Sequence, residues 1–267
     1  MYNYWDRINR NGLMPYSASA AEMDAQAARI TQLAPESVES LVAQARNSLF
    51  RREWAKSLAM HKEAYERYPG SVDTNLSYGS DLYFSGHREQ GLHIMEAGAA
   101  LDPLSLDALT RLSFIHMQSG KCSEVQRLAE RALEIEPGMS RMRGYMGYCL
   151  LIKGDSADEA LNWLAREPLG FIRNSGNAIA LNRLGRQPDA VKQVEILMAD
   201  SGDPAAYQFA QIYAQWGDTR QALDWLRKAI DLRDPGVLNL RIDSFIDPIR
   251  QEAEFQSMLV ELGLGEK

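Results

Sequence analysis

Residues 104–137 read LSLDALTRLSFIHMQSGKCSEVQRLAERALEIEP, and the organisation of this stretch recurs along the chain. The stretch ends on Pro137, and earlier prolines stand at 35, 69 and 103, so that each gap is 34 residues. A fixed spacing of this length is the signature of a repeated supersecondary unit. Apolar residues at helical spacing on both sides of Gly120 predict two helices joined by a turn. The sequence therefore predicts an array of helix pairs.

Small residues recur at fixed places in each unit. With the closing proline counted as position 32, position 8 is small in six units, which hold Ala45, Gly79, Ser113, Gly147, Ala178 and Ala210. Position 20 follows this rule less strictly, with Ser57, Gly91, Val125, Glu159, Ala190 and Ala222. One inserted residue would bring Ala160 to that place in the fourth of these units. Helix axes approach closely only where the side chains between them are small, so these places predict the helix crossings.

The unit length, the small residues and the closing proline together resemble the tetratricopeptide repeat. This resemblance implies an all-α fold, a right-handed α-solenoid of about six helix–turn–helix repeats with a C-terminal capping helix. We expect a single solenoid over residues 1–267, in units 2–35 (degenerate), 36–69, 70–103, 104–137, 138–168, 169–202 and 203–234, with a cap over 235–267. Pro168 comes early and shortens one helix, so that the repeat has either drifted there or bends near 165–176.

The C-terminal part carries a narrower resemblance. Residues 207–236 read YQFAQIYAQWGDTRQALDWLRKAIDLRDPG. This stretch is similar to the tetratricopeptide regions of bacterial winged-helix transcription regulators and adenylate cyclases. The repeats begin almost at residue 1, so the chain is expected to be either a stand-alone relative or the C-terminal part of a longer protein. A final helix is expected from about Asp247 to Leu262, with Asp247 as its N-cap before Pro248.

Composition narrows the class of protein. The chain has 29 Lys+Arg and 36 Asp+Glu, a net charge of −7, which disfavours nucleic acid and anionic membrane surfaces as partners. No stretch approaches the roughly 18 consecutive apolar residues of a membrane span. Two cysteines in 267 residues exclude a disulfide scaffold, and we expect Cys122 and Cys149 to be free and buried. These features predict a cytoplasmic protein.

Motifs that carry chemistry are missing from the sequence. It contains no phosphate-binding loop of the type GxxxxGK[ST], no GxSxG and no HExxH. The four histidines, His61, His87, His93 and His116, lack metal-ligand spacing, and packing is the expected role of His61 and His116. We therefore predict a protein that is not an enzyme, with no catalytic residues, no metal site and no cofactor.

The resemblance also implies a binding face. In tetratricopeptide repeats the concave face comes mostly from positions 2, 5, 9, 12 and 13 of each first helix. Carried onto this sequence, the candidate groove residues are Arg46, Leu76, Tyr83, Phe84, Phe114, Met117, Arg141, Tyr148, Asn182 and Arg183. Aromatic residues, Met and Arg dominate protein interfaces, so this lining suits an extended or helical peptide with large apolar anchors. The alternative for apolar members such as Leu76 is simple packing between helices.

The functional prediction is a bacterial interaction scaffold that binds a peptide or partner domain in the concave groove. The alternative is a sensory or regulatory module of a larger bacterial signalling protein, such as a transcription regulator or adenylate cyclase. An open reading frame that extends upstream of Met1 would favour the alternative. The Lys and Asn clamp of chaperone-binding relatives is missing, so we expect no binding of acidic chaperone tails. The sequence does not specify an oligomeric state.

Overall fold

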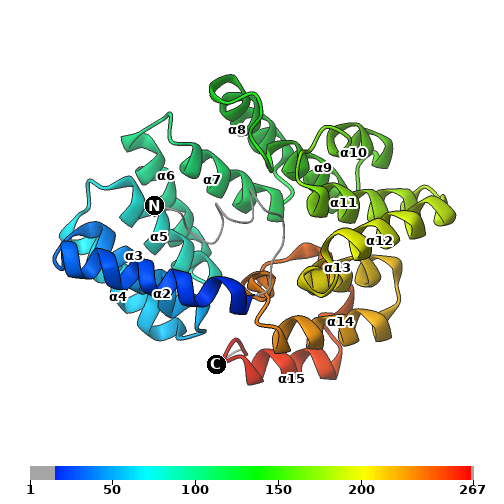
Figure 1. Cartoon of the computed structure of the whole chain (residues 1–267). Coiled ribbons are helices and arrows are strands. Elements are labelled where there is room, and N and C mark those ends of the chain that lie inside the picture. Colours follow the sequence, from blue (N-terminus) through cyan, green and yellow to red (C-terminus); the bar gives the residue numbers. More distant parts are fainter. Residues whose placement is uncertain (1–15, 266–267) are drawn as a thin grey trace. The chain divides into compact units, whose positions relative to one another are not determined.

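The computed structural model describes residues 16–265, which form α-helices and short 3-10 helices and contain no strand (Figure 1). The chain divides into two compact units, Ser17–Leu112 and Ser113–Lys267, and the division falls inside helix α7. The helices up to this division are α2 (Tyr16–Leu33), α3 (Val38–Phe50), α4 (Trp54–Arg67), α5 (Val72–Phe84), α6 (Arg88–Leu101) and α7 (Leu106–Gln118). Consecutive helices pair as the repeat predicts.

The second unit continues the helix pairs and ends in the cap. Its α-helices are α8 (Cys122–Ile135), α9 (Met142–Lys153), α10 (Ala157–Leu164), α11 (Gly170–Arg183), α12 (Gln187–Ser201), α13 (Ala206–Trp216), α14 (Thr219–Asp231) and α15 (Ala253–Glu261). Its 3-10 helices are η1 (Asp203–Ala205), η2 (Pro235–Asn239) and η3 (Ser244–Ile249). The first helix of the degenerate unit 2–35 is expected before Tyr16 and so lies outside the described residues, whereas α2 is its second helix.

Paired helices cross where the sequence places small residues. A Cβ atom added to Gly91 of α6 would lie 2.5 Å from the carbonyl oxygen of Gly79 in α5, so the two backbones are in direct contact. The other small residues at these positions are fully buried, namely Ala45, Ser57, Ser113, Ala160, Ala178, Ala190, Ala210 and Ala222. The burial of Ala160 confirms that one inserted residue shifts the register in that unit.

The turn inside each pair uses the left-handed backbone conformation. Glycines take it in most pairs, with positive φ at Gly86, Gly120, Gly154, Gly185 and Gly217. The first full unit has Arg52 at this place, and Arg52 adopts φ 63°. A side chain in this region costs roughly 1–2 kcal/mol because Cβ crowds the following carbonyl oxygen. The turn geometry is therefore imposed by the helix packing even where the residue opposes it.

A buried glutamate secures the shortened repeat around Pro168. Helix α10 ends at Leu164, after eight residues, as the early proline predicts. Glu167 is 1% exposed, and its carboxyl oxygens accept hydrogen bonds from the backbone N–H groups of Arg141 (2.9 Å), Gly144 (2.9 Å) and Leu169 (3.1 Å). The bonds from Arg141 and Gly144 satisfy donors at the start of α9 that have no helical partner, and the bond from Leu169 does so at the start of α11. The bend expected near 165–176 stays a prediction.

The cap differs from the expected helix over residues 247–262. Asp243 starts a 3-10 segment, with its side chain accepting from the N–H of Phe245 at 2.9 Å, and Pro248 lies inside this segment. The last α-helix begins only at Ala253, so the prediction of Asp247 as its N-cap is wrong. Phe255 of α15 is fully buried in a core shared with α13 and α14, which is the packing expected of a cap.

The two cysteines form a disulfide, so the expectation of free cysteines is wrong. Cys122 opens α8 and Cys149 lies toward the end of α9, with their Cα atoms 5.6 Å apart. Successive helices of the array run in opposite directions, which brings the start of α8 beside the end of α9. A separation of 27 residues carries no such information by itself, because the contact depends on helix direction.

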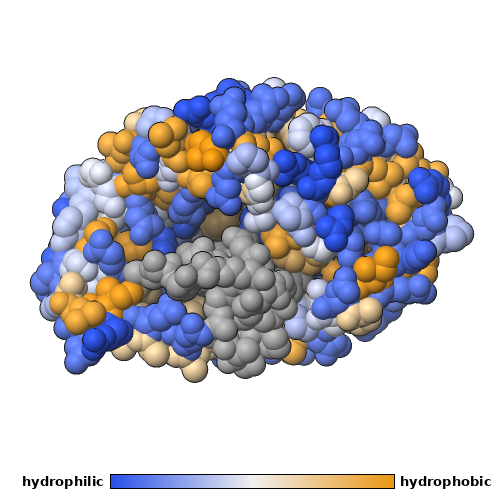
Figure 2. Space-filling model, turned by 45° about the horizontal axis from the view of Figure 1, so that its top comes forward, coloured by the Kyte–Doolittle hydropathy of each residue, from blue (hydrophilic) through white to orange (hydrophobic). Residues whose placement is uncertain are grey.

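Ion pairs between residues three apart lie on exposed second helices such as α8. Pairs three residues apart on α8 join Arg127 to Glu124 (2.9 Å) and Arg131 to Glu134 (3.0 Å). The face drawn in Figure 2 is mostly hydrophilic, with apolar residues in small separate patches. Exposed pairs of this kind contribute little stability, typically about 0.3–0.5 kcal/mol each, and serve mainly solubility.

We predict that Gly91→Ala destabilises the chain. The new methyl group would lie 2.5 Å from the carbonyl oxygen of Gly79 and 2.7 Å from the backbone nitrogen of Tyr83, and backbone atoms cannot move aside cheaply. Overpacking of this kind costs about 1–3 kcal/mol, measured as the loss in free energy of unfolding in urea. The control is Gly70→Ala, where no atom lies within 4 Å of the added Cβ. Equal stability of the two variants would contradict the close crossing.

Candidate functional site

A polar network crosses the first helices of the unit Ser17–Leu112. Arg46 of α3 donates to Asp73 of α5 at 2.5 Å and to Ser77 of α5 at 3.3 Å. One repeat further on, Arg111 of α7 donates to Asp107 at 3.0 Å and contacts the Ser80 hydroxyl of α5 at 3.5 Å. We call these six residues, with Tyr83 and Phe84, the first inner face.

The arginines of this face lie beneath their carboxylate partners. The side chain of Arg46 is 18% exposed against 44% for Asp73, and that of Arg111 is 24% exposed against 54% for Asp107. Burial alone would raise the pKa of Asp107, but the Arg111 guanidinium outweighs it and holds this pKa below the ordinary value. The face therefore presents oxygen acceptors over fixed positive charge, with a net charge close to zero.

Aromatic residues end the first inner face. The rings of Tyr83 and Phe84 meet edge to face with centroids 6.3 Å apart, Tyr83 being buried and Phe84 half-buried. Leu76, also predicted for the groove, has no exposed surface and is a core residue of α5. The correction follows from α5 being buried along almost its whole length, so that position 5 packs between helices.

The other predicted groove residues belong to the unit Ser113–Lys267. The Phe114 ring lies 5.7 Å from that of Tyr145, whereas Met117 is 1% exposed and is a core residue, which corrects its assignment to the groove. Arg141 is 8% exposed and lies over the Phe171 ring at 5.9 Å. Arg141 thus packs against α11 in this structure.

The last two predicted residues follow at the end of α11. Asn182 is half-buried and Arg183 is exposed. The Arg183 guanidinium donates to the carbonyl oxygen of Leu151 and, at 2.6 Å, to the amide oxygen of Gln215. The guanidinium end is partly desolvated by these neighbours, and this desolvation lowers its pKa. Arg183 therefore links first helices of neighbouring repeats, a structural contact that does not require a ligand.

Tyr148 is covered by the chain's own C-terminal part. The Phe245 ring packs edge to face on the Tyr148 ring at 5.2 Å, and the next residue back, Ser244, bonds to the end of α7. The Ser244 hydroxyl donates to the carbonyl oxygen of Gln118 at 3.0 Å, and the Ser244 N–H donates to its side-chain oxygen at 3.2 Å. We call Asp243–Ser244–Phe245 the closing segment.

The rest of the closing segment is held by α13. The Tyr207 hydroxyl donates to Asp243 at 2.8 Å, and the Gln211 amide donates to the same oxygen at 2.6 Å. The Gln215 amide donates to the carbonyl oxygen of Phe245 at 2.9 Å. These three α13 residues occupy positions 5, 9 and 13 of their repeat, which are places where the resemblance puts a ligand. The second inner face, defined by Gln118, Tyr148 and these three residues, is therefore occupied from within the chain.

Sequence reasoning missed the closing segment. An Asp two residues before Phe245 signals a local turn, and the structure has this turn. Nothing in the local pattern indicates that the turn contacts Gln118, which lies 126 residues away. The one usable signal was the polar character of Gln211 and Gln215 at inward positions, because buried amides require partners.

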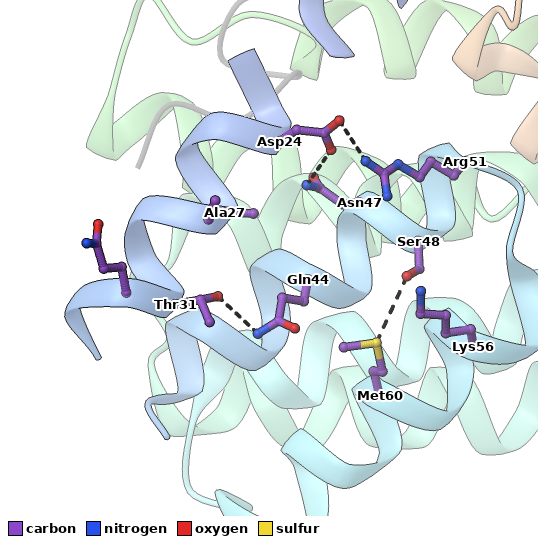
Figure 3. Close-up of a pocket in the computed structure, with 11 residues that line it drawn as sticks. Asp24, Ala27, Thr31, Gln44, Asn47, Ser48, Arg51, Lys56 and Met60 are labelled. Atoms are coloured by element: carbon purple, nitrogen blue, oxygen red, sulfur yellow. Dashed lines mark hydrogen bonds and ion pairs between the residues drawn. The ribbon is translucent and has the colours of Figure 1, made fainter. Parts of the chain in front are cut away.

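A polar cleft of about 540 Å³ separates α2 from α3 and α4 (Figure 3). Its lining side chains bond to one another across the helices: Asp24 pairs with Arg51 at 2.7 Å, and Gln44 donates to Thr31 at 3.0 Å. Ala27 of α2 lines the cleft and is buried, with 6% of its surface exposed. We interpret the cleft as a polar seam between helices, since its groups satisfy each other.

A buried Ser–His–Asp cluster joins α4 to α5 without the geometry of a relay. The Ser57 hydroxyl and His61 Nδ1 both lie 2.8 Å from the same carboxyl oxygen of Asp81. A nucleophilic triad requires the histidine between the other two groups. His61 is 1% exposed and lies in the core between α4 and α5, where it contacts Asp81. Among residues 16–265 no group of three or more His, Cys, Asp or Glu side chains could hold a metal ion.

Comparison with solved structures identifies the fold. A tetratricopeptide repeat protein from Parabacteroides merdae aligns over 92% of this chain and 96% of its own, with a TM-score of 0.60 and 14% identity. The APC/C hetero-tetramer Cut9–Hcn1 aligns with a TM-score of 0.60 and 11% identity over 88% of this chain, which spans 46% of that chain's length. Neither a family model nor a curated protein sequence matches.

These likenesses establish the tetratricopeptide-repeat fold for this chain. At 14% and 11% identity they establish the fold alone. The similarity of the C-terminal part to winged-helix regulators and adenylate cyclases stays a prediction. No described helix has the length and apolar character needed to cross a bilayer.

We predict that Asp243→Asn loosens the cap. One side-chain oxygen becomes a donor and faces either the N–H of Phe245 or the donors of Tyr207 and Gln211. The free energy of unfolding at pH 7 should fall by about 1–3 kcal/mol, the cost of leaving a buried polar group unsatisfied. The control is Asp247→Asn in the same segment, an exposed residue whose ion pair with Arg250 (2.8 Å) should matter by less than about 0.5 kcal/mol.

The pH dependence of this loss has a definite sign. Burial raises the pKa of Asp243 above the ordinary value of 3.8, so the folded chain holds this proton more tightly than the unfolded chain. The contribution of Asp243 is therefore greatest below pH 3.8 and declines as the pH rises through the folded-state pKa. The stability gap between the native chain and Asp243→Asn should be wider near pH 4.5 than at pH 7. A gap that narrows on acidification would contradict the assignment.

Proposed function

We propose that the chain is a non-enzymatic interaction scaffold that binds a peptide segment of a protein partner on the first inner face. The observation that carries this proposal is the network of Arg46, Asp73, Ser77, Asp107 and Arg111. It keeps charged groups partly exposed on three successive first helices. Charged side chains fixed in this way, beside the half-buried ring of Phe84, supply both orientation and anchoring for a ligand.

The chemistry of the face favours an extended peptide. Acceptor oxygens of Asp73 and Asp107 alternate with the donors of Arg46 and Arg111 across the helices. An extended backbone offers N–H and C=O groups in alternation, so it can match such a row without a charge of its own. Phe84 at the end of the face provides an aromatic surface for an apolar side chain of the peptide.

The second inner face supports the proposal that inner-face positions bind polypeptide. There the equivalent positions hold the closing segment, whose Asp243 and Phe245 are 1% and 2% exposed. A polypeptide segment with an acidic residue and an aromatic anchor is thus already accommodated on an inner face of this chain. We infer that inner-face positions in this array are suited to bind polypeptide, and that the first inner face does so with a partner.

The alternative function is that of a regulatory module, and it has a separate test. A regulatory module of a larger bacterial signalling protein would use the same inner face, with the ligand supplied by a neighbouring domain or a second protein. An upstream extension of the natural reading frame that encodes an effector domain would favour this alternative. The Cys122–Cys149 disulfide argues against the predicted cytoplasmic location, because disulfides are rare in the cytosol.

We predict that Asp73→Asn combined with Asp107→Asn changes peptide selection. Removing both carboxylates takes away the ion-pair partners of Arg46 and Arg111 and raises the net charge of the first inner face by two. Peptides that bind the native chain can be selected from a displayed library of random 16-residue sequences and measured by fluorescence anisotropy. Selected peptides with basic residues should bind the variant at least about tenfold more weakly, and acidic ones more tightly.

The matched control removes two carboxylates elsewhere in the same unit. Glu89→Gln with Glu96→Gln changes exposed residues of α6, a second helix outside the inner face. This control should bind every selected peptide like the native chain. If both double variants shift the affinities equally, the effect is one of net charge and the first inner face is not the site.

A further inference from the structure

We propose that Cys122 and Cys149 form a thiol–disulfide exchange site that controls how firmly the closing segment is held. Both cysteines lie in the unit Ser113–Lys267, and their Cα separation of 5.6 Å is that of a pair that bonds without backbone movement. The bond joins the start of α8 to the end of α9. It therefore fixes the spacing between two consecutive repeats.

Each cysteine is close in sequence to a residue that contacts the closing segment. Gln118, which accepts both hydrogen bonds from Ser244, lies four residues before Cys122. Tyr148, whose ring supports Phe245, directly precedes Cys149. Ser244 contacts the end of α7 and Phe245 contacts α9. The disulfide thus links the two elements that hold these residues.

The turn between α7 and α8 transmits this constraint. It is closed by backbone hydrogen bonds from Gly120 to Met117 (3.0 Å) and from Lys121 to His116 (2.9 Å). Gly120 adopts φ 64°, the left-handed conformation of a tight turn. A turn closed in this way moves as one piece, so a change at Cys122 shifts the position of Gln118.

The two sulfur atoms differ in access. Cys149 is fully buried, whereas Cys122 is half-buried and is flanked by the exposed Lys121 and Ser123. A thiolate of a dithiol reductant attacks the Cys122 sulfur, the S–S bond breaks, and Cys149 leaves as a thiolate that takes up a proton. The second thiol of the reductant then resolves the mixed disulfide and releases Cys122. Two electrons and two protons pass from the dithiol to the chain, and a disulfide oxidant reverses the reaction.

Reduction should loosen the contacts of Ser244 with Gln118 and leave the α13 contacts of the closing segment in place. The contacts from α13 do not depend on the disulfide: Asp243 keeps Tyr207 and Gln211, and Phe245 keeps its N–H bond to Asp243. The Ser244 contacts to Gln118 depend on the position of the α7–α8 turn. The two neighbouring amides therefore report on these contacts separately: the Ser244 N–H on the bond to Gln118, and the Phe245 N–H on the bond to Asp243.

Amide hydrogen exchange of the full chain by NMR tests the proposal, with a phosphine or dithiol reductant as the probe. Reduction should accelerate exchange of the Ser244 N–H at least about tenfold and change that of the Phe245 N–H by less than about threefold. The variant Cys122→Ser should show the accelerated Ser244 exchange with or without reductant. The variant Ser123→Ala, beside the cysteine and exposed, should respond to reductant like the native chain.

Three results would overturn the proposal. Titration of two free thiols per chain after exposure to a disulfide oxidant would show that the bond does not form. Unchanged Ser244 exchange on reduction would show that the bond does not control the closing segment. Equally accelerated amide exchange throughout Ser113–Lys267 would show that the disulfide stabilises the whole unit and does not control this segment selectively.

Discussion

Direct contact between helix backbones is the constraint on which the rest of this structure depends. Where Gly79 faces Gly91, a carbonyl oxygen occupies the space that a Cβ would need, and buried alanines or serines play this part in other pairs. Close approach at these points fixes the rotation of each helix about its own axis. Every other side chain of the repeat is then assigned to the core, the outer face or the inner face. The spacing of 34 residues repeats this assignment along the chain.

The two inner faces carry different residues at the same positions of the repeat and make different contacts. In Ser17–Leu112 they hold arginines and carboxylates that pair across helices and stay partly exposed. In Ser113–Lys267 they hold Gln118 and Gln211, which hydrogen-bond to the closing segment, and Tyr148, whose ring packs on Phe245. The difference lies in the partner: the paired Arg and Asp side chains of the first face keep part of their surface exposed, whereas the amides of Gln118 and Gln211 on the second face are bonded to a segment of the chain itself. That segment is Asp243–Ser244–Phe245.

The sequence predicted the features that follow from the repeat. Helix pairing, left-handed turn glycines such as Gly154 and buried small residues such as Ala160 depend on neighbours within one or two units, so a fixed period reveals them. The Cys122–Cys149 bond and the contact of Ser244 with Gln118 join residues from different repeats, so they follow from three-dimensional packing. The groove assignments of Leu76 and Met117 failed for a related reason: a position in the repeat does not specify how deeply neighbouring helices bury it.

Irregular places in the array are stabilised by buried acidic side chains that bond to backbone and polar donors. Glu167 follows the shortened α10 and accepts three backbone N–H groups, and Asp243 opens the 3-10 segment of the cap and accepts a backbone N–H, a hydroxyl and an amide. In both places the regular helix pair is interrupted, and buried backbone or side-chain donors need an acceptor that the helices do not supply. A carboxyl group, with two oxygens that each accept more than one bond, satisfies several such donors at once. This capacity explains why a repeat can lose part of a helix at Pro168, and end in an irregular cap, while the packing of its neighbours is preserved.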